Sequence, residues 1–553
     1  MRAFMRKITR KMLTLVIGLT IVLMSVASVY SQPLWNTVKN DKGVLTLSAW
    51  FTAQNVGDLL SNTAGLDNAV NWCKQNGVTK VYLEAFGRGL YADRKTLVDA
   101  KSRFLKEGFE VQSGVTTTKF GKEDPGTEWK AECYSNKGTQ EELQRIFEYA
   151  ASMFDEIIID DWYFTNCRCE ECITARGDQT WSKYYGDLMV KMSQERVMKP
   201  AHAVNPNAKV IIKFPQWYDE FHMRGYEVVR EPKIFDGIWV GTESRNFDYD
   251  TSTGYEIGYN AYFNMRWLGS LGRVGGGWFD SGRTTVNTFL EQARHTVLGD
   301  GKEIILWCYG NMLPETNGTG AIKGTPAANM KALSKELPGL IKLAKIVRDK
   351  PIKGIHLLKP GNSEPFEEEW VCSFLGNLGL PLVPAHEINE QAASAIFPVQ
   401  ALKDPGFPGS LQRMLDKGTP VIITDGLAKR LTSHSAILKN KNLTVLQVQG
   451  TPKQLLKLTR EELKPIRDKL LAPMGMKFDA PNKVELYLFG DNYFVMENIN
   501  DEAVDVTLDF PHVSNVSKAL VLPEDGGNAE LSQSGNSVKI RISPRTLVAV
   551  EYR

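Results

Sequence analysis

Short apolar, β-branched runs alternate with amphipathic stretches through the first two thirds of the chain. Eight such runs can be counted, namely VLTLSAWF (from Val44), KVYLEAFG (Lys80), EVQSGVTTT (Glu110), EIIIDDWYF (Glu156), KVIIKFPQW (Lys209), GIWVGTESR (Gly237), RVGGGWFD (Arg273) and EIILWCYG (Glu303). Intervening segments such as TQEELQRIFEYAASMFD and TTVNTFLEQARHTVL have apolar residues at helical spacing. Parallel strands buried on both faces have this nearly continuous apolar character, so the pattern predicts a (β/α)₈ barrel over residues 32–350. The alternative, a doubly wound open sheet, is disfavoured because no glycine-rich phosphate loop follows the first run.

Two further units follow the predicted barrel. Residues 351–450 contain the strand candidates IKGIHLLK, VIITDG and LTVLQVQ with amphipathic helices between them, which predicts a small α/β domain. Residues 451–476 include LLKLTREELKPIRDKLL, a lysine-rich helical linker. Residues 477–553 alternate apolar and polar positions, which is typical of a small antiparallel β domain.

The N-terminus differs from the rest. Five basic residues precede an apolar run from Met12 to about Val26, and small residues follow, so residues 1–31 are predicted to be a signal peptide cut before Gln32. The alternative is an uncleaved anchor, but the run is shorter than the ~20 residues that a membrane span needs. We therefore expect an exported protein, periplasmic or extracellular, without membrane attachment after cleavage.

The composition is that of an ordinary globular protein. The 553 residues are 42% hydrophobic and 24% charged. Loss of the leader, which carries five basic and no acidic residues, changes the formal charge from +2 to −3, so nothing favours nucleic acid as a partner.

The predicted strand ends gather carboxylates, cations and aromatic side chains. Functional residues of (β/α)₈ barrels lie at these C-terminal ends. In chain order they are Trp50, Glu84, Asp160, Asp161, Lys213, Trp217, Tyr218, Glu243, Arg245, Trp278, Asp280, Trp307 and Tyr309. Aromatic faces stack on sugar rings, and glycosidic cleavage needs one carboxylic acid and one carboxylate, so the mixture predicts a sugar-cleaving hydrolase. No histidine lies at a predicted strand end, although His222 falls in the loop after the fifth, which disfavours a Ser-His-Asp or zinc hydrolase.

Four acidic residues are the catalytic candidates. Asp160 and Asp161 follow the apolar run III, where only one of two successive side chains points squarely into the barrel mouth. Glu243 and Asp280 end the sixth and seventh runs, and the alternative role of each is a salt bridge with a neighbouring arginine. Substrate-binding roles are predicted for Glu84, Lys213, Trp217, Arg245, Trp278 and Trp307.

The seven cysteines are an odd number, and four of them are expected to meet. Cys167, Cys169 and Cys172 form a C-x-C-x₂-C arrangement directly after the acidic pair, and Cys133 lies in the neighbouring loop. Four thiolates from two adjacent loops can form a closed, structural zinc site. The alternative is one disulfide and two free thiols. Catalysis itself is expected to need no cofactor.

This acidic strand end with its cysteine cluster resembles the β-galactosidases of glycoside hydrolase family forty-two. The resemblance implies a structural zinc, a flavodoxin-like domain that forms oligomers (a homo-oligomer through residues 351–450), and a small β domain. It also implies that Asp161 is the acid/base and Asp280 the nucleophile. In the family both of these residues are Glu, and the acid/base Glu is preceded by Asn, whereas this chain has Asp at both positions and Asp160 before the first. The chain also resembles retaining α-galactosidases, in which Asp160 or Asp161 would attack and Glu243 would protonate the leaving group.

Three functions therefore compete. The first is an exported glycoside hydrolase acting on oligo- or polysaccharides. The second is a carbohydrate-binding barrel without activity, and the third is a polysaccharide lyase or deacetylase, for which Lys213 near acids would abstract a proton.

Overall fold

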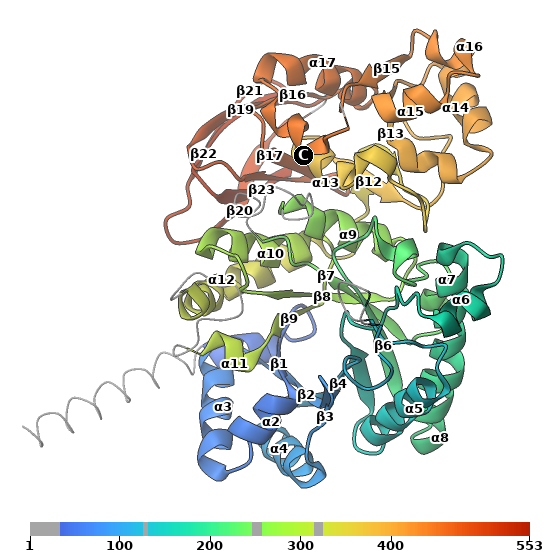
Figure 1. Cartoon of the computed structure of the whole chain (residues 1–553). Coiled ribbons are helices and arrows are strands. Elements are labelled where there is room, and N and C mark those ends of the chain that lie inside the picture. Colours follow the sequence, from blue (N-terminus) through green and yellow to red (C-terminus); the bar gives the residue numbers. More distant parts are fainter. Residues whose placement is uncertain are drawn as a thin grey trace, which may run out of the picture.

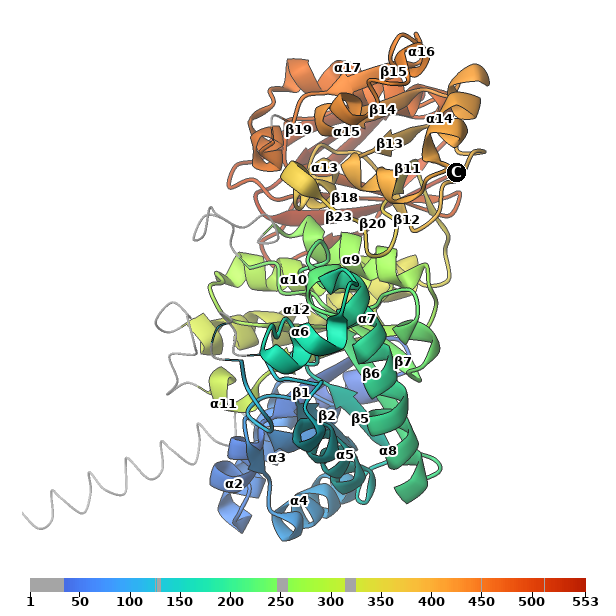
Figure 2. The ribbon, with the colours of Figure 1, turned by 45° about the vertical axis from the view of Figure 1, so that its right-hand side comes forward.

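The computed structural model describes residues 34–124, 126, 131–245, 257–313, 325–448, 450–511 and 513–553. The barrel lies at one end of the molecule, and the two C-terminal units lie together at the other (Figure 1 and Figure 2). Helices α9 (Tyr259–Gly269) and α10 (Val286–Leu298) lie between these parts in both views. The predicted signal peptide falls outside the described residues. Among the residues searched, we find no helix with both the length and the apolar character of a membrane span.

Eight parallel strands close into a barrel, as predicted. They are β1 (Thr46–Phe51), β2 (Lys80–Gly87), β4 (Glu110–Thr116), β5 (Glu156–Ile159), β6 (Lys209–Phe214), β7 (Gly237–Gly241), β8 (Val274–Asp280) and β9 (Glu303–Trp307). Strand β1 pairs with both β2 and β9, which closes the ring. The short β3 (Leu90–Tyr91) extends β2 as an antiparallel hairpin at the mouth.

Helices cover most of the barrel. The outer cover includes α3 (Thr63–Gln75), α4 (Arg94–Lys106), α5 (Lys137–Ala151), α7 (Trp181–Met192), α8 (Lys199–Val204), α9, α10 and α12 (Thr325–Val347). Side chains of Asn62, Asp93, Asn136, Thr180 and Thr285 accept hydrogen bonds from the first-turn amides of their helices, which fixes where each begins.

The connection between β6 and β7 departs from the expected repeat. In this stretch, which is described throughout, two 3₁₀ turns (Phe221–Met223 and Glu231–Lys233) stand where a helix was expected. The connection packs against the second domain instead. Tyr218 and Ser373 share a hydrogen bond of 2.8 Å, and the buried Lys359 lies 3.1 Å from Asp219.

The barrel interior is closed at its N-terminal end. Lys80 Nζ lies 2.7 Å from Glu156 and 3.1 Å from Glu303, and Tyr82 donates to Glu303 at 2.9 Å. Above this polar layer pack Trp50, Ile158, Ile211, Trp278 and Ile305. The interior is therefore a packed core, and only the C-terminal end is left for a site.

The second domain contains a parallel sheet in the order β12-β11-β13-β14-β15. Its strands are β11 (Ile355–Leu358), β12 (Leu382–Ala385), β13 (Ala395–Phe397), β14 (Val421–Thr424) and β15 (Leu443–Leu446), with α13 (Val371–Gly376), α14 (Phe407–Asp416) and α15 (Asp425–Arg430). The run IKGIHLLK was expected to form one strand, but β10 (Ile352–Lys353) separates from it and pairs with the β domain. The predicted linker helix is α17 (Arg460–Leu471), which begins with a capping box at Thr459.

The C-terminal domain consists of two antiparallel sheets. One has the order β10-β17-β18-β23-β20, with β17 (Val484–Phe489), β18 (Tyr493–Asn498), β20 (Val516–Leu522) and β23 (Thr546–Tyr552). The other has the order β16-β19-β22-β21, with β16 (Lys477–Asp479), β19 (Val504–Asp509), β21 (Ala529–Ser534) and β22 (Ser537–Ile542).

Candidate functional site

Four of the predicted residues meet around one ammonium group at the barrel mouth. Lys213, on β6, places Nζ 2.8 Å from Glu243 Oε1, 3.2 Å from Asp161 Oδ2 and 3.9 Å from Asp160 Oδ1. The two aspartates directly follow β5, and Glu243 follows β7, so the cluster joins three neighbouring strands.

The lysine in this cluster is held in its charged form. Its side chain is only 1% exposed, and its Nζ lies 4.3 Å from the centre of the Trp278 ring. Burial by itself lowers the pKa of Lys213, but attraction to Asp161, Glu243 and Asp160 outweighs it and raises the pKa above its usual value. A buried ammonium that stays charged can bind two carboxyl groups at fixed positions.

The two successive aspartates have different surroundings. The Asp160 side chain is 5% exposed and accepts from the Asp161 amide at 2.8 Å and from the Thr116 hydroxyl at 3.1 Å. The Asp161 side chain is 18% exposed, and its backbone carbonyl accepts from Tyr226. Asp161 is therefore the more accessible of the pair, a distinction that sequence alone left open.

The Thr116 hydroxyl links two carboxyl groups below the cluster. Thr116 Oγ1 hydrogen-bonds both Asp160 and Glu84. Glu84 also accepts a hydrogen bond from the Ala53 amide at 2.5 Å. A hydroxyl has one hydrogen, so one of the two carboxyl groups must be protonated to satisfy both contacts. Burial raises the pKa of Glu84 to about 7, and burial followed by repulsion from Asp161 raises the pKa of Asp160 well above its usual value.

Glu243 has one free carboxyl oxygen. Oε1 accepts from Lys213, while the buried Oε2 has no hydrogen-bond partner among the described residues. Burial raises the pKa of Glu243, although Lys213 partly opposes this effect. Because Lys213 Nζ lies 3.2 Å from Asp161 Oδ2 and 2.8 Å from Glu243 Oε1, these two oxygens are at most 6.0 Å apart, the sum of the two distances.

Asp280 lies at the end of β8 and is 22% exposed. It accepts from Arg245 at 2.8 Å and from the Gly282 amide at 2.7 Å, so the salt bridge that the sequence offered as its alternative role is present. A Cβ at Gly275 would lie 2.2 Å from the Trp239 ring, so that glycine makes room for a tryptophan of the barrel interior.

The aromatic candidates divide into a floor and a rim. Trp50 and Trp278 are buried with ring centres 4.5 Å apart, below the carboxylates. Trp307 is half-buried, with the Arg88 guanidinium 5.7 Å from its ring centre. Trp217 is half-buried and stacks with Arg224 at 4.9 Å. Contact of these residues with substrate stays a prediction.

A cavity that sequence reasoning missed opens beside the cluster. It has a volume of about 360 Å³ and is lined by Arg88, Thr117, Thr118, Lys119, Glu123, Ala131, Glu132, Trp162 and Phe164. Its residues come from the loops after β2, β4 and β5. Arg88 and Lys119 have φ of 55° and 57°, in the left-handed region that non-glycine residues rarely occupy, and such residues concentrate at functional sites. No sequence pattern indicated these loop conformations.

The structure brings the four predicted cysteines together. Cys133 Sγ lies 3.5 Å from Cys169 Sγ and 3.6 Å from Cys172 Sγ, and all four sulfurs, including that of Cys167, lie within 4.8 Å of one another. Four sulfurs bound to zinc at about 2.3 Å lie roughly 3.8 Å apart, whereas a disulfide needs about 2.05 Å. All four are free thiols, so the donor set fits zinc.

Comparison with known proteins identifies the family of this chain. Residues 34–336, more than half of the chain, match the family described as "Probable glycosyl hydrolase, catalytic domain". The chain belongs to this family. This glycosyl hydrolase family member is 27% identical over 299 residues to an uncharacterized protein of Saccharolobus solfataricus, a match that covers 48% of this chain and 49% of that protein. The chain thus spans about half the length of this curated relative.

A solved structure shares the fold of this family member across nearly its whole length. The β-galactosidase of the Antarctic haloarchaeon Halorubrum lacusprofundi matches with a TM-score of 0.54 and 10% identity, over 92% of this chain and 99% of that one.

Proposed function

We propose that this chain is an exported glycoside hydrolase that cleaves oligo- or polysaccharides with retention of configuration, with Asp161 as nucleophile and Glu243 as acid/base. The observation that carries the proposal is the contact of both carboxyl groups with Lys213, which limits their nearest oxygens to a separation of 6.0 Å. Retaining enzymes have carboxyl groups about 5 to 5.5 Å apart, whereas inverting enzymes have about 6.5 to 9.5 Å.

The two roles follow from the surroundings of each group. Asp161 is the more exposed aspartate, and Lys213 holds its carboxyl group where it can attack the anomeric carbon. Burial raises the pKa of Glu243, which favours a carboxylic acid that donates its proton to the leaving oxygen. The glycosyl–Asp161 ester is then hydrolysed by a water whose proton passes to the Glu243 carboxylate.

The neighbouring residues position these groups or the sugar. Asp160, held by Thr116, orients the Asp161 backbone from below. Asp280 and Arg245 form an accessible ion pair that suits sugar hydroxyls, and Trp307 offers an aromatic face. The 360 Å³ cavity beside Trp162 is of a size that suits further sugar units.

Two further properties belong to the proposal. Cys133, Cys167, Cys169 and Cys172 would hold a zinc ion, which joins the loops after β4 and β5 and has no part in the chemistry. The basic and apolar pattern of residues 1–31 supports export. Oligomer formation through the second domain stays a prediction.

Aryl glycosides of both anomeric configurations, β-galactosides among them, test the proposal. Wild type should release the aglycone from at least one, and Asp161→Asn and Glu243→Gln should each lower kcat by about 10³-fold or more. NMR of the reaction shows the anomeric configuration of the sugar that is released first. If the enzyme is retaining, this sugar has the same configuration as the substrate. Asp280→Asn is the matched control, which should raise KM more than it lowers kcat.

Other outcomes would decide for the competing functions. Sugar binding without release of aglycone, from aryl glycosides or natural glycans, would indicate a binding protein. An unsaturated sugar product would indicate a lyase. If Asp280→Asn abolished turnover while Glu243→Gln did not, the nucleophile would instead be Asp280.

A further inference from the structure

A second group of buried ionisable residues lies between the barrel and the β domain, remote from the barrel mouth. Glu485 on β17 and Glu497 on β18 face each other directly in the antiparallel pair, and both side chains are 0% exposed. Like charges directly opposite each other on a sheet destabilise it. Two buried carboxylates in this register therefore require positive charge between them.

An imidazole from the barrel lies against both carboxyl groups. His295, fully buried on α10, places Nε2 2.7 Å from Glu485 Oε2 and 3.3 Å from Glu497 Oε2. Among the described residues, Glu485 Oε1 and Glu497 Oε2 have no hydrogen-bond partner. His295 Nε2 and Glu497 Oε2 therefore lie 3.3 Å apart without a hydrogen bond between them. Two atoms that bind the same metal ion are arranged in this way.

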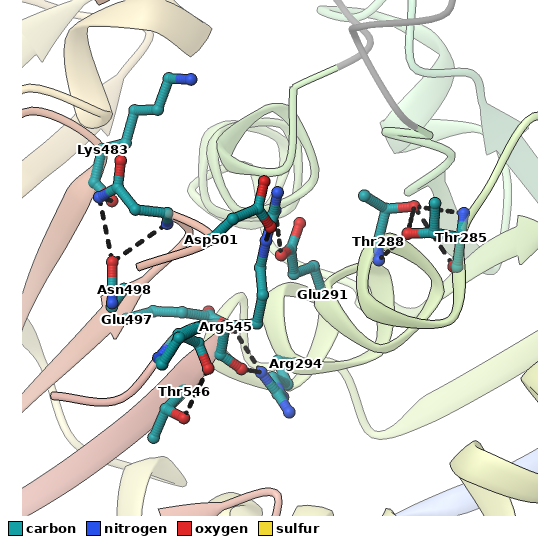
Figure 3. Close-up of polar contacts among 12 residues, drawn as sticks. Thr285, Thr288, Glu291, Arg294, Lys483, Glu497, Asn498, Asp501, Arg545 and Thr546 are labelled. Atoms are coloured by element: carbon teal, nitrogen blue, oxygen red, sulfur yellow. Dashed lines mark hydrogen bonds and ion pairs between the residues drawn. The ribbon is translucent and has the colours of Figure 1, made fainter. Parts of the chain in front are cut away.

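Carboxyl groups outnumber guanidinium groups around this cluster. Four buried carboxyl groups and two guanidinium groups meet here, namely Glu291, Glu336, Glu485, Glu497, Arg294 and Arg545. Arg294 contacts Glu497 at 3.0 Å, and Arg545 contacts Glu291 at 3.0 Å (Figure 3). The carboxyl groups exceed the guanidinium groups by two, and either a protonated imidazole or a bound divalent cation would add positive charge between them.

We propose that His295, Glu485 and Glu497 form a closed binding site for a divalent transition-metal ion of the Zn²⁺ class. Nitrogen and oxygen ligands bind zinc at about 2.0 to 2.2 Å, which places them roughly 3.3 Å apart in a tetrahedral site. The His295–Glu497 contact of 3.3 Å has this length, whereas the His295–Glu485 contact of 2.7 Å is a hydrogen bond that would lengthen when an ion enters. A mixed set of one imidazole and two carboxylates suits such an ion better than Ca²⁺ or Mg²⁺, which prefer oxygen ligands alone.

The surroundings of the imidazole support this arrangement. A Cβ at Gly258 would lie 3.1 Å from His295 Nδ1 and 3.7 Å from Glu291 Oε2, so the glycine leaves room for both groups on the same side. Glu291 precedes His295 by one helical turn, while the buried Nδ1 of His295 has no hydrogen-bond partner among the described residues. The ion would join α10 of the barrel to both strands of the β domain.

X-ray diffraction at the zinc absorption edge, on crystals of the full chain grown with Zn²⁺, tests the proposal. We expect two anomalous peaks, one among the four cysteine sulfurs and one between His295 Nε2 and the two carboxylates. A peak at the cysteines without one at His295 would overturn the proposal and leave a protonated imidazole as the occupant.

Metal analysis in solution gives an independent measurement. His295→Gln and Glu485→Gln should each lower the bound metal by one ion per chain. His386→Gln, a control at a partly buried histidine elsewhere in the chain, should not. An unchanged metal content in folded His295→Gln would also overturn the proposal. If the variants do not fold, the diffraction experiment on the wild type still decides.

Discussion

Replacement of Lys213 by methionine tests how the mouth cluster controls protonation. The ammonium lies 2.8 Å from Glu243 Oε1 and lowers the pKa of that carboxyl group, against the larger effect of burial. At this distance, two unit charges interact by about 6 kcal/mol with an effective dielectric constant of 20, or roughly four pKa units as an upper limit. Opposite charges at such distances commonly shift a pKa by about 1 to 3 units.

The sign of the effect on activity follows from the role of the group. Without the ammonium, Glu243 keeps its proton to higher pH, so the basic limb of kcat/KM against pH should move upward by at least about one unit. At the same time kcat should fall, because Asp161 loses the cation that positions it. Removal of one partner from a buried ion pair should also lower the free energy of unfolding by about 3 to 5 kcal/mol.

The control is Lys213→Arg, which keeps the charge and should leave the basic limb near its wild-type position. Thermal unfolding of both variants shows whether each is folded at the assay temperature. A folded Lys213→Met enzyme whose basic limb coincides with that of the wild type would refute the assignment of Glu243 as the acid beside Lys213.

Three further predictions concern packing, metal and substrate. Gly275→Ala should lower the free energy of unfolding, measured by denaturant titration, by about 1 to 3 kcal/mol, because its Cβ would overlap the Trp239 ring. The control is Gly57→Ala, which lies in a helix with open space around it and should be neutral or stabilising. Cys169→Ser should remove one zinc ion per chain and lower Tm, without changing kcat at temperatures where the variant is folded; loss of kcat in a folded variant would contradict a structural role. Asp280→Asn should raise KM about tenfold, as measured by initial rates, and a change confined to kcat would contradict a binding role.

The barrel was predictable because its signal is local. Each buried parallel strand leaves a short apolar run, and the four cysteines were placed together because their loops follow adjacent strands. The β10 strand was assigned to the wrong domain, because two residues carry no pattern that distinguishes one sheet from another.

The site was predictable in its members but not in its contacts. Asp161, Lys213 and Glu243 were each recognised at a strand end, yet their shared contact depends on packing between three strands. Arg88 and Lys119 were missed as parts of a cavity, because backbone dihedrals in long loops leave no periodic signal.

The β6–β7 connection links the stability of the catalytic barrel to the rest of the chain. Since no helix covers the barrel there, the second domain supplies the cover, and Asp219 is buried only because Lys359 balances its charge and the Trp370 amide donates to it at 2.7 Å. Residues 32–350 alone would expose this surface and leave Asp219 without either partner. We therefore expect the barrel and the second domain to melt together in a single calorimetric transition, so that heat or proteolysis inactivates the enzyme as one cooperative unit.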